Sequence, residues 1–358
     1  MTRLVGTVIG MASDTTGTSL SVLDLAPVPS GSSVGDALRN SIDLVRRVEA
    51  LGFHRYWVAE HHNMPGIASS SPAVLLAHLA MVSSTIRLGS GGVMLPNHAP
   101  LAIAEQFGML EAIHPGRIDL GLGRAPGTDP TTARALRGTR LHESDDFLAR
   151  FGELLAFFDE TFPADHPYAR ITAVPGAGCS PAVWLLGSSD FGANVAGQLG
   201  LPFSFAHHFG MGGTEIALET YRGSFVPSAA LSEPYAMIGV QVVCAPTDEE
   251  ARFLAGASAL GFLWLRQGRP SRMPTPEEAR DYRYSAQERA FIEERLGRAV
   301  IGSPDRVRAG LEALASEHGV DELMITTAVH SHTDRIRSFE LVADEWLSRR
   351  LLDPAVPA

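Results

Sequence analysis

The stretch IRLGSGGVMLPNHAPLAIAEQFGMLEAIHPGRIDLG, residues 86–121, contains one complete unit of the pattern that decides the fold. Apolar residues and glycines make up most of 86–95, which predicts a buried strand, and apolar residues recur at helical spacing over 100–113. A second short apolar run at 117–121 predicts another strand. A strand, a helix and a strand of these lengths form a βαβ unit, in which the two strands run parallel.

The same alternation continues on both sides of that unit. Further strands are predicted at 20–25, 55–59, 183–187, 203–206, 235–245 and 322–327, and further helices at 33–52, 72–83, 131–158, 191–199, 213–225, 248–265, 305–318 and 333–351. Eight strands with intervening helices predict an α/β fold, a single-domain (β/α)8 TIM barrel over residues 18–358, after an N-terminal extension of residues 1–17. A doubly wound sheet remains the alternative, because the alternation does not say whether the sheet closes.

The composition excludes several classes of protein. With 358 residues, of which 45% are hydrophobic, the chain can bury a large core, and its net charge of −11 does not resemble a nucleic-acid-binding surface. All 29 basic residues are Arg, which excludes a P-loop NTPase, a pyridoxal phosphate Schiff base and a lysine nucleophile. Cys179 and Cys244 form no CxxC motif, and no apolar stretch is long enough to span a membrane. We therefore expect a cytoplasmic protein without a thiolate metal site.

The residues just after the predicted strands are rich in functional side chains. In a barrel of this type the active site lies at the carboxyl ends of the strands. The candidates there are Asp24, Glu60, His61, His62, Asn63, Asn97, His98, Arg124, Ser188, Ser189, Asp190, His207 and His208. We therefore expect several histidines to converge on one rim of the barrel.

Four segments at these strand ends together resemble the bacterial luciferase-like, flavin-dependent monooxygenases. They are AEHHN at 59–63, GSGGVMLPNHAP at 89–100, AEQFGMLEAIHPGRIDLGLGRAPG at 104–127 and VWLLGSSD at 183–190. The resemblance is nearest to the short, single-chain members of the family. It implies that reduced FMN and O2 form a flavin peroxide, which oxygenates a small apolar or aromatic organic substrate. It also implies a homodimer and, as one source of reduced flavin, a separate NAD(P)H:flavin reductase.

The resemblance also implies roles for individual residues. The family has a non-prolyl cis peptide against the flavin ring where this chain has Gly91-Gly92, although a tight turn would need the same glycines. The remaining cofactor-binding residues that it implies are Arg124, Leu186, Gly187, Ser188, Ser189 and Phe191. In the same match Glu60 pairs with Arg124. Ordinary helix capping by Ser189 or Asp190 is the alternative for the 187–190 segment.

His61 is the predicted catalytic residue, because it matches the first histidine of the family's pair. A neutral imidazole that titrates near working pH can act as a general base. His62 should point elsewhere, since neighbouring residues alternate in direction along an extended chain. The remaining residues expected to support the site or line the substrate cavity are Glu60, His62, Asn97, His98 and His207.

Residues 267–298 form the one compositional break, dense in Pro, Arg and Glu. The resemblance implies a mobile lid after the seventh strand, which would exclude water from the reaction. A solvated surface insertion accounts for the same composition. Ala73, Ala77 and Ala80 would allow close approach of two helices in a dimer, although core packing explains them equally well.

Three alternative functions remain open from the sequence. The first is a dehydrogenase of the same superfamily that uses the deazaflavin F420. The second is a barrel hydrolase whose zinc or iron is held by Asp24, His61, His207 and His208. The third is a non-catalytic flavin-binding subunit. We expect no metal at the preferred site, and the sequence does not determine the substrate or the type of oxygenation.

Overall fold

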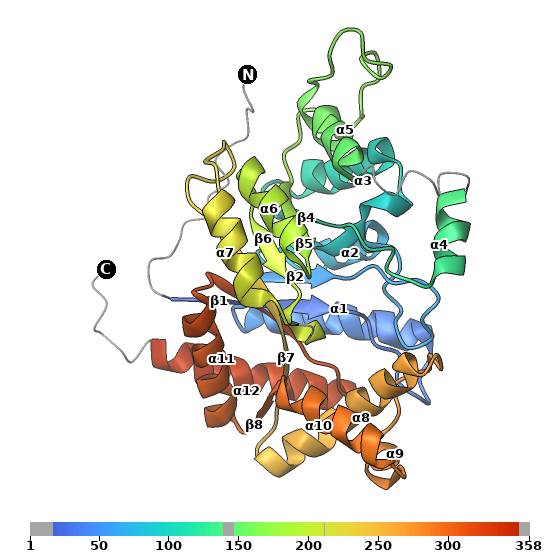
Figure 1. Cartoon of the computed structure of the whole chain (residues 1–358), viewed down its shortest axis with the longest axis vertical. Coiled ribbons are helices and arrows are strands. Elements are labelled where there is room, and N and C mark those ends of the chain that lie inside the picture. The colour runs from blue at the N-terminus through green and yellow to red at the C-terminus, as the bar shows by residue number, and fades with distance from the viewer. Residues whose placement is uncertain (1–16, 139–146, 211, 351–358) are drawn as a thin grey trace.

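The computed structural model describes residues 17–138, 147–210 and 212–350, and its centre is a closed barrel of eight parallel strands (Figure 1). The barrel strands are β1 (Ser19–Asp24), β2 (Arg55–Val58), β3 (Arg87–Met94), β4 (Ile118–Gly123), β5 (Ala182–Gly187), β6 (Phe203–Phe205), β7 (Ala236–Cys244) and β9 (Glu322–Thr326). Each strand pairs with the next, and β9 closes the barrel by pairing with both β7 and β1. The predicted (β/α)8 barrel is therefore confirmed, and the open sheet is wrong.

Helices cover the outside of the barrel, as Figure 1 shows. They are α1 (Val34–Ala50), α2 (Pro72–Ala80), α3 (Pro100–Ile113), α6 (Asp190–Leu199), α7 (Thr214–Ser224), α8 (Asp248–Arg266), α11 (Pro304–His318) and α12 (His332–Arg350). A capping box of Ser33 and Asp36 begins α1, and proline in the first turn begins α2, α3 and α11. Because helices cover one face of every strand and side chains fill the interior, the strands are buried on both faces.

The predicted helix at 131–158 is two helices, α4 (Pro130–Arg137) and α5 (Phe147–Asp159). Gly138 ends α4 with φ of +58°, a left-handed conformation that favours glycine. Residues 139–146 lie outside the described residues. So do residues 1–16 of the predicted N-terminal extension and the last predicted helical residue, Leu351.

The segment 267–298 contains two short helices, α9 (Pro276–Asp281) and α10 (Ala286–Gly297). Each begins with a capping box, Thr275 with Glu278 and Ser285 with Glu288. They pack against α8, where their buried apolar residues join one cluster. A ninth strand, β8 (Val300–Gly302), pairs with β7 outside the closed barrel. The insertion after the seventh strand is thus ordered and packed on the barrel wall.

Large side chains and a buried ionic network fill the barrel interior. Trp57 and Trp184 meet edge to face, with ring centroids 5.1 Å apart. Arg55 is fully buried between Asp119 and Glu322, with a nitrogen-to-oxygen distance of 2.7 Å to each. The charges are paired, as buried charges must be. These side chains fill the barrel interior below the carboxyl ends of the strands. A site is therefore expected at those ends.

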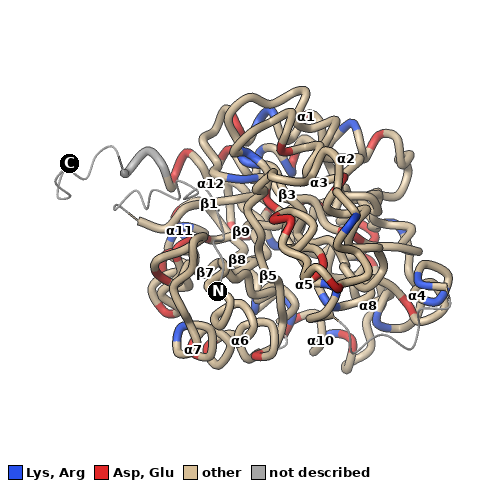
Figure 2. The backbone as a smooth tube through the Cα atoms, turned by 90° about the horizontal axis from the view of Figure 1, so that it is seen from above, with Lys and Arg blue, Asp and Glu red and all other residues tan. Residues whose placement is uncertain are grey.

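Figure 2 shows acidic and basic positions interspersed over the outer helices. Within the described part of the chain, none of the helices combines the length and the hydrophobicity that crossing a membrane requires.

Candidate active site

Glu60 is the centre of a hydrogen-bonded cluster at the carboxyl end of β2. Its buried carboxylate accepts hydrogen bonds from His62 Nε2 and from His98 Nε2, both at 2.9 Å. The backbone N–H of Met94 donates to it at 2.9 Å, and Asn97 Nδ2 donates at 3.3 Å. The carboxylate therefore ties the end of β2 to the end of β3 and the residues that follow it.

These donors decide the charge of Glu60. Burial alone would raise the pKa of Glu60, but hydrogen bonds from His98, His62 and the Met94 amide lower it below its ordinary value. The side chain is therefore ionised at neutral pH. Of the residues expected to support the site, Glu60, His62, Asn97 and His98 all lie in this one cluster.

His61 lies beside this cluster with its ring unpaired among the described side chains. Its backbone N–H donates to Ser69 O at 3.0 Å, and its Nδ1 is enclosed without a hydrogen-bond partner. Burial lowers the pKa of His61 below its ordinary value. The imidazole is therefore neutral at pH 7, and Nε2 is the nitrogen left to meet a ligand.

His208 follows the carboxyl end of β6. It lies close enough to His61 that a charge on one ring would affect the pKa of the other. Its Nδ1 is enclosed against Gly239 of β7, whose backbone hydrogen-bonds the ring, and it would lie 2.4 Å from a Cβ placed on that glycine. Burial, with smaller contributions from Arg295 and His61, lowers the pKa of His208 to about 4. The site thus holds two neighbouring neutral imidazoles. The preferred sequence interpretation missed His208, although the pair His207-His208 after a strand repeats the signal that singled out His61.

His207 faces the opposite way. Its Nδ1 lies 2.9 Å from Thr214 Oγ1 at the start of α7, and its ring centroid is 5.5 Å from that of His318 at the end of α11. Its contacts are therefore with two outer helices. The structure corrects the expectation that His207 lines the cavity, because the inward position belongs to its neighbour His208.

Arg124 follows β4 and lies at the start of α6. Its guanidinium carbon is 4.3 Å from the ring centroid of Phe191, the second residue of that helix. No carboxylate among the described residues pairs with Arg124. The expected ion pair with Glu60 is therefore wrong, since His62 and His98 already occupy that carboxylate. The guanidinium is free to meet an anion.

The first turn of α6 adds a second positive group at the same place. Ser189 occupies the N-cap position, but its side chain makes no capping hydrogen bond, so helix capping by Ser189 is not realised. Ser188 and Ser189 are exposed, and Gly187 and Leu186 are half-buried at the end of β5. Unsatisfied N–H groups at a helix N-terminus favour an anion. Together with Arg124 they form a corner that fits a phosphate, although the exposed carboxylate of Asp190, the first residue of α6, adds a negative charge there.

Gly91 and Gly92 are joined by a cis peptide bond inside β3. The pairing of β3 with β4 shifts at this point, so the segment is an irregularity within a strand and not a turn. A Cβ on Gly91 would lie 2.8 Å from Leu23 Cδ1, and one on Gly92 would lie 2.8 Å from Gly121 O. The backbone contact requires glycine at position 92, whereas a side chain at position 91 would have to displace the end of the Leu23 side chain.

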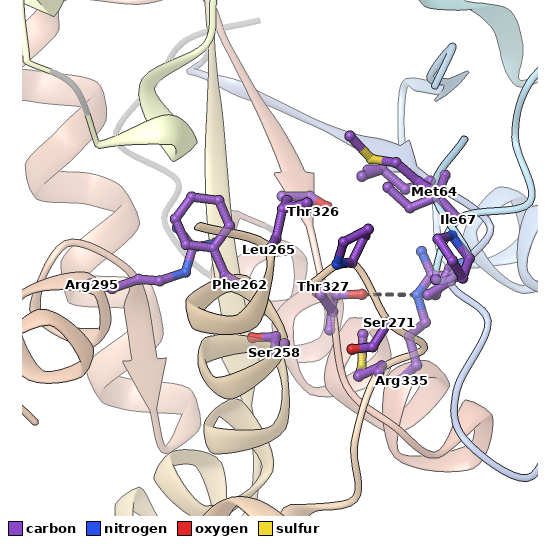
Figure 3. A pocket seen from close by; sticks show the side chains of 18 residues that line it. Met64, Ile67, Ser258, Phe262, Leu265, Ser271, Arg295, Thr326, Thr327 and Arg335 are labelled. Carbon is purple, nitrogen blue, oxygen red and sulfur yellow. Dashed lines mark hydrogen bonds between the residues drawn. The ribbon is translucent and has the colours of Figure 1, made fainter. Parts of the chain in front are cut away.

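A cavity of about 180 Å³ opens between α8 and the carboxyl ends of β1 and β9 (Figure 3). Its wall is mostly apolar, with Met64 and Ile67 facing Phe262 and Leu265. Arg295 and Thr327 are among its polar residues. An apolar cavity with a few polar groups is typical of a small-molecule site.

The four residues that a metal-dependent hydrolase would need do not meet. Asp24 is fully buried and binds Arg335 at 2.8 Å, together with the hydroxyls of Ser41 and Tyr56. His207 contacts the outer helices instead. Over the residues described, no three histidine, cysteine or acidic side chains gather as metal ligands would.

Comparison with known proteins places this geometry in a family. The family model described as luciferase-like monooxygenase matches residues 18–322. The Bacillus subtilis (strain 168) protein YvbT is 49% identical over 93% of this chain and 98% of its own length. The Escherichia coli (strain K12) luciferase-like monooxygenase is 45% identical over 91% and 96%. The N-acetyl-S-alkylcysteine monooxygenase of B. subtilis is 33% identical over 92% and 99%.

Solved structures share the fold. Apo-MsnO8 superimposes with a TM-score of 0.84 at 36% identity, over 92% of this chain and 99% of the other. The oxygenating constituent of the Pseudomonas putida 3,6-diketocamphane monooxygenase, solved with FMN, gives a TM-score of 0.65 at 18% identity, over 92% and 97%. An F420-dependent secondary alcohol dehydrogenase gives 0.59 at 14%, over 91% and 99%. The last two likenesses concern the fold alone, whereas the family match and the close relatives cover most of the chain. This barrel, with its Glu-His-His strand end, therefore belongs to the luciferase-like monooxygenases.

Proposed function

We propose that this protein is an FMN-dependent monooxygenase that uses reduced flavin and O2 to place one oxygen atom on a small apolar or aromatic organic substrate. The observation that carries the proposal is the corner at the start of α6. There the unpaired guanidinium of Arg124 stacks on Phe191, next to the uncapped N-terminus of the helix. The phosphate dianion of FMN would satisfy both groups at once.

The residues around this corner fit the rest of the cofactor. Leu186 lies beside Gly92, since its Cδ2 is 3.3 Å from the place of a Cβ on that glycine. We infer that Gly91, Gly92 and Leu186 bind the flavin ring, while Gly187, Ser188 and Ser189 bind the phosphate side. When bound, reduced FMN would supply the electrons that activate O2.

His61 is the residue that we propose to move a proton. Its neutral imidazole can hold or accept a proton at Nε2, next to the position proposed for the ring. The neighbouring Glu60 cluster fixes the end of β2, from which His61 projects, by bonds to His62 and His98. His208 places a second neutral imidazole beside His61.

One relative, 33% identical to this chain, is named an N-acetyl-S-alkylcysteine monooxygenase. We therefore propose N-acetyl-S-alkylcysteines, which are thioethers, as the first substrates to test. We further propose a separate NAD(P)H:flavin reductase as the source of reduced flavin. A cytoplasmic location agrees with two cysteines, Cys179 and Cys244, that form no disulfide.

An anaerobic titration with reduced FMN and, in parallel, with reduced F420 tests the proposal. We expect tight binding of reduced FMN and, when air is admitted with a substrate, an oxygenated product, whereas reduced FMN without the protein only consumes O2 to form H2O2. Tight binding of F420 alone would instead favour the dehydrogenase. FMN binding without any oxygenated product would favour the non-catalytic subunit.

Replacing Arg124 by Ala tests the corner itself. We expect Arg124→Ala to weaken FMN binding by about tenfold to a hundredfold, the contribution of a charge-assisted pair, and to leave riboflavin binding nearly unchanged. Arg134→Ala is the matched control, because Arg134 is exposed on the neighbouring helix α4. Equal losses for FMN and riboflavin would show that Arg124 does not bind the phosphate.

A further inference from the structure

We propose that the cavity beside α8 accepts substrates that carry a carboxylate, and that Arg295 of α10 recognises this group. The inference rests on the proposed oxygenase function, because it assigns the substrate of that reaction to the cavity, whose lining includes Met64 and Ile67 on the loop that follows His61. It starts from the one cationic side chain of the cavity lining that has no acidic partner among the described residues.

Two arginines line the cavity, and their surroundings differ. Arg335 donates to Asp24 Oδ1 at 2.8 Å and to the carbonyl oxygen of Thr327 at 2.9 Å, so its charge is neutralised inside the protein. Arg295 donates from Nη2 to the neutral Gln241 Oε1 at 3.2 Å, and its Nε is enclosed without a partner. The cavity therefore carries one uncompensated positive charge.

Neutral groups hold the guanidinium of Arg295 in place. Its carbon lies 3.7 Å from the ring centroid of Phe262 on α8, and Figure 3 shows the two side chains together at one side of the cavity. Gln241, which faces the interior near the end of β7, receives the hydrogen bond and in turn donates to Ser258 Oγ at 3.1 Å. A stacked and anchored guanidinium loses little freedom when it binds a carboxylate.

The environment of Arg295 makes an anion favourable. Burial lowers the pKa of Arg295 to about 10, and no acidic group offsets this effect. The side chain is still charged at neutral pH, so a ligand that brings an opposite charge into the cavity restores the balance. Thr327 adds a second vacant partner, because its hydroxyl oxygen is enclosed without a hydrogen bond and the residue is only 1% exposed.

The position of Arg295 relates the carboxylate to the proposed reaction. The charge of Arg295 acts on His208, and His208 also interacts with His61. An acid bound at Arg295 therefore has its apolar part in the cavity lined by Met64 and Ile67, on the loop that follows His61. The carboxylate is held away from the reacting end of the substrate.

Calorimetric titration of matched acids and amides tests the inference. The probes are hexanoate and 3-phenylpropanoate, each compared with its primary amide, on protein with and without FMN. For the parent we expect at least one carboxylate to bind about tenfold tighter than its amide, as a charge-assisted pair predicts. In Arg295→Gln this ratio should fall to about one, whereas Arg295→Lys should keep part of it because the charge remains.

Arg289→Gln is the matched control, since Arg289 is exposed on the same helix and the chemical change is identical. Carboxylates that bind the parent no better than amides, or not at all, would overturn the inference. So would a preference that survives Arg295→Gln, or a loss of FMN affinity with the preference intact, which would assign the arginine to the flavin. Circular dichroism of each variant checks the fold. The FMN titration is read separately, so a parent that binds carboxylates but not FMN would contradict the proposed function alone.

Discussion

At the scale of the residue, the site depends on which polar atoms have partners and which do not. Glu60 accepts four hydrogen bonds and is saturated, so it fixes the strand ends and has no capacity left for Arg124. Arg124 is exposed and has no carboxylate partner among the described residues, Arg295 has only the neutral Gln241 as a side-chain partner, and the ring of His61 has none. Enclosed polar atoms without partners, such as Arg295 Nε and His61 Nδ1, are costly in a folded protein unless a ligand completes them. We therefore assign binding and proton transfer to these three residues.

His61 carries the prediction at this scale. We expect His61→Ala to keep the fold and FMN affinity but to abolish oxygenated product, because the variant lacks the imidazole to which we assign the proton transfer. Burial lowers the pKa of His61, so the neutral ring should persist below pH 6.5, and kcat/KM of the parent should fall only on further acidification. Product analysis and a pH profile measure both effects.

Asn63→Ala is a suitable control, since Asn63 is exposed at the same strand end and bonds Asp129 at 3.0 Å. Undiminished product from His61→Ala would remove His61 from the mechanism. An acidic limb above pH 6.5 would show that another group titrates.

At the scale of the element, strand β7 shapes the site from below. Gly239 leaves room for the ring of His208, and Gln241 two residues later anchors Arg295. Alternate residues of a strand share a face, so one strand supports both the imidazole and the guanidinium. The helices α8 and α10 supply Phe262 and Arg295 themselves.

Gly239→Ala tests this arrangement. Its Cβ would lie 2.4 Å from His208 Nδ1, and we expect a loss of about 1 to 3 kcal/mol in the free energy of unfolding, typical of overpacking. Chemical denaturation measures the loss. Gly152→Ala on α5, where nothing lies within 4 Å of the new Cβ, should be neutral or stabilise by about 0.5 to 1 kcal/mol. Equal stability of the parent and Gly239→Ala would show that the ring of His208 can move aside freely.

At the scale of the whole molecule, barrel closure brings together strand ends that are far apart in the sequence. Glu60 and His98 are 38 residues apart and meet, and Arg335 pairs with Asp24 across 311 residues. Large apolar side chains also remain exposed on α2 and α3 or at their ends, namely Val74, Met81, Met109 and Ile113. Ala77 is exposed beside them, whereas Ala80 is buried in the core. The homodimer implied by the family resemblance would cover this surface.

We expect the parent to sediment as a dimer at micromolar concentration, and Met81→Glu combined with Ile113→Glu to shift it to monomer. Each introduced carboxylate would have to be buried without a partner in the interface. Ile216→Glu on α7 is the control, because Ile216 is 63% exposed and Ile113 is 62% exposed. Analytical ultracentrifugation decides the outcome. A monomeric parent, or an equal effect of the control, would contradict this interface.

The sequence by itself determined the eight barrel strands and most helices in order, because strand and helix periodicity is a local property and each cap or glycine acts within a few residues. It joined α4 and α5 into one helix and did not show β8. It also determined which residues stand at strand ends, including His61, Arg124 and the 187–190 segment. It missed α9 and α10, because each has a capping box but an apolar face that spans too few residues to show a helical period. It also left the closure of the sheet open.

Only the tertiary structure decided how those residues are partnered. Glu60 binds His98 and not Arg124, His208 and not His207 faces inward, and Arg295 reaches the cavity from the insertion. These partners and orientations depend on contacts between segments that are tens to hundreds of residues apart in the sequence. Such contacts follow from the closed barrel and its packing, and local patterning carries no information about them.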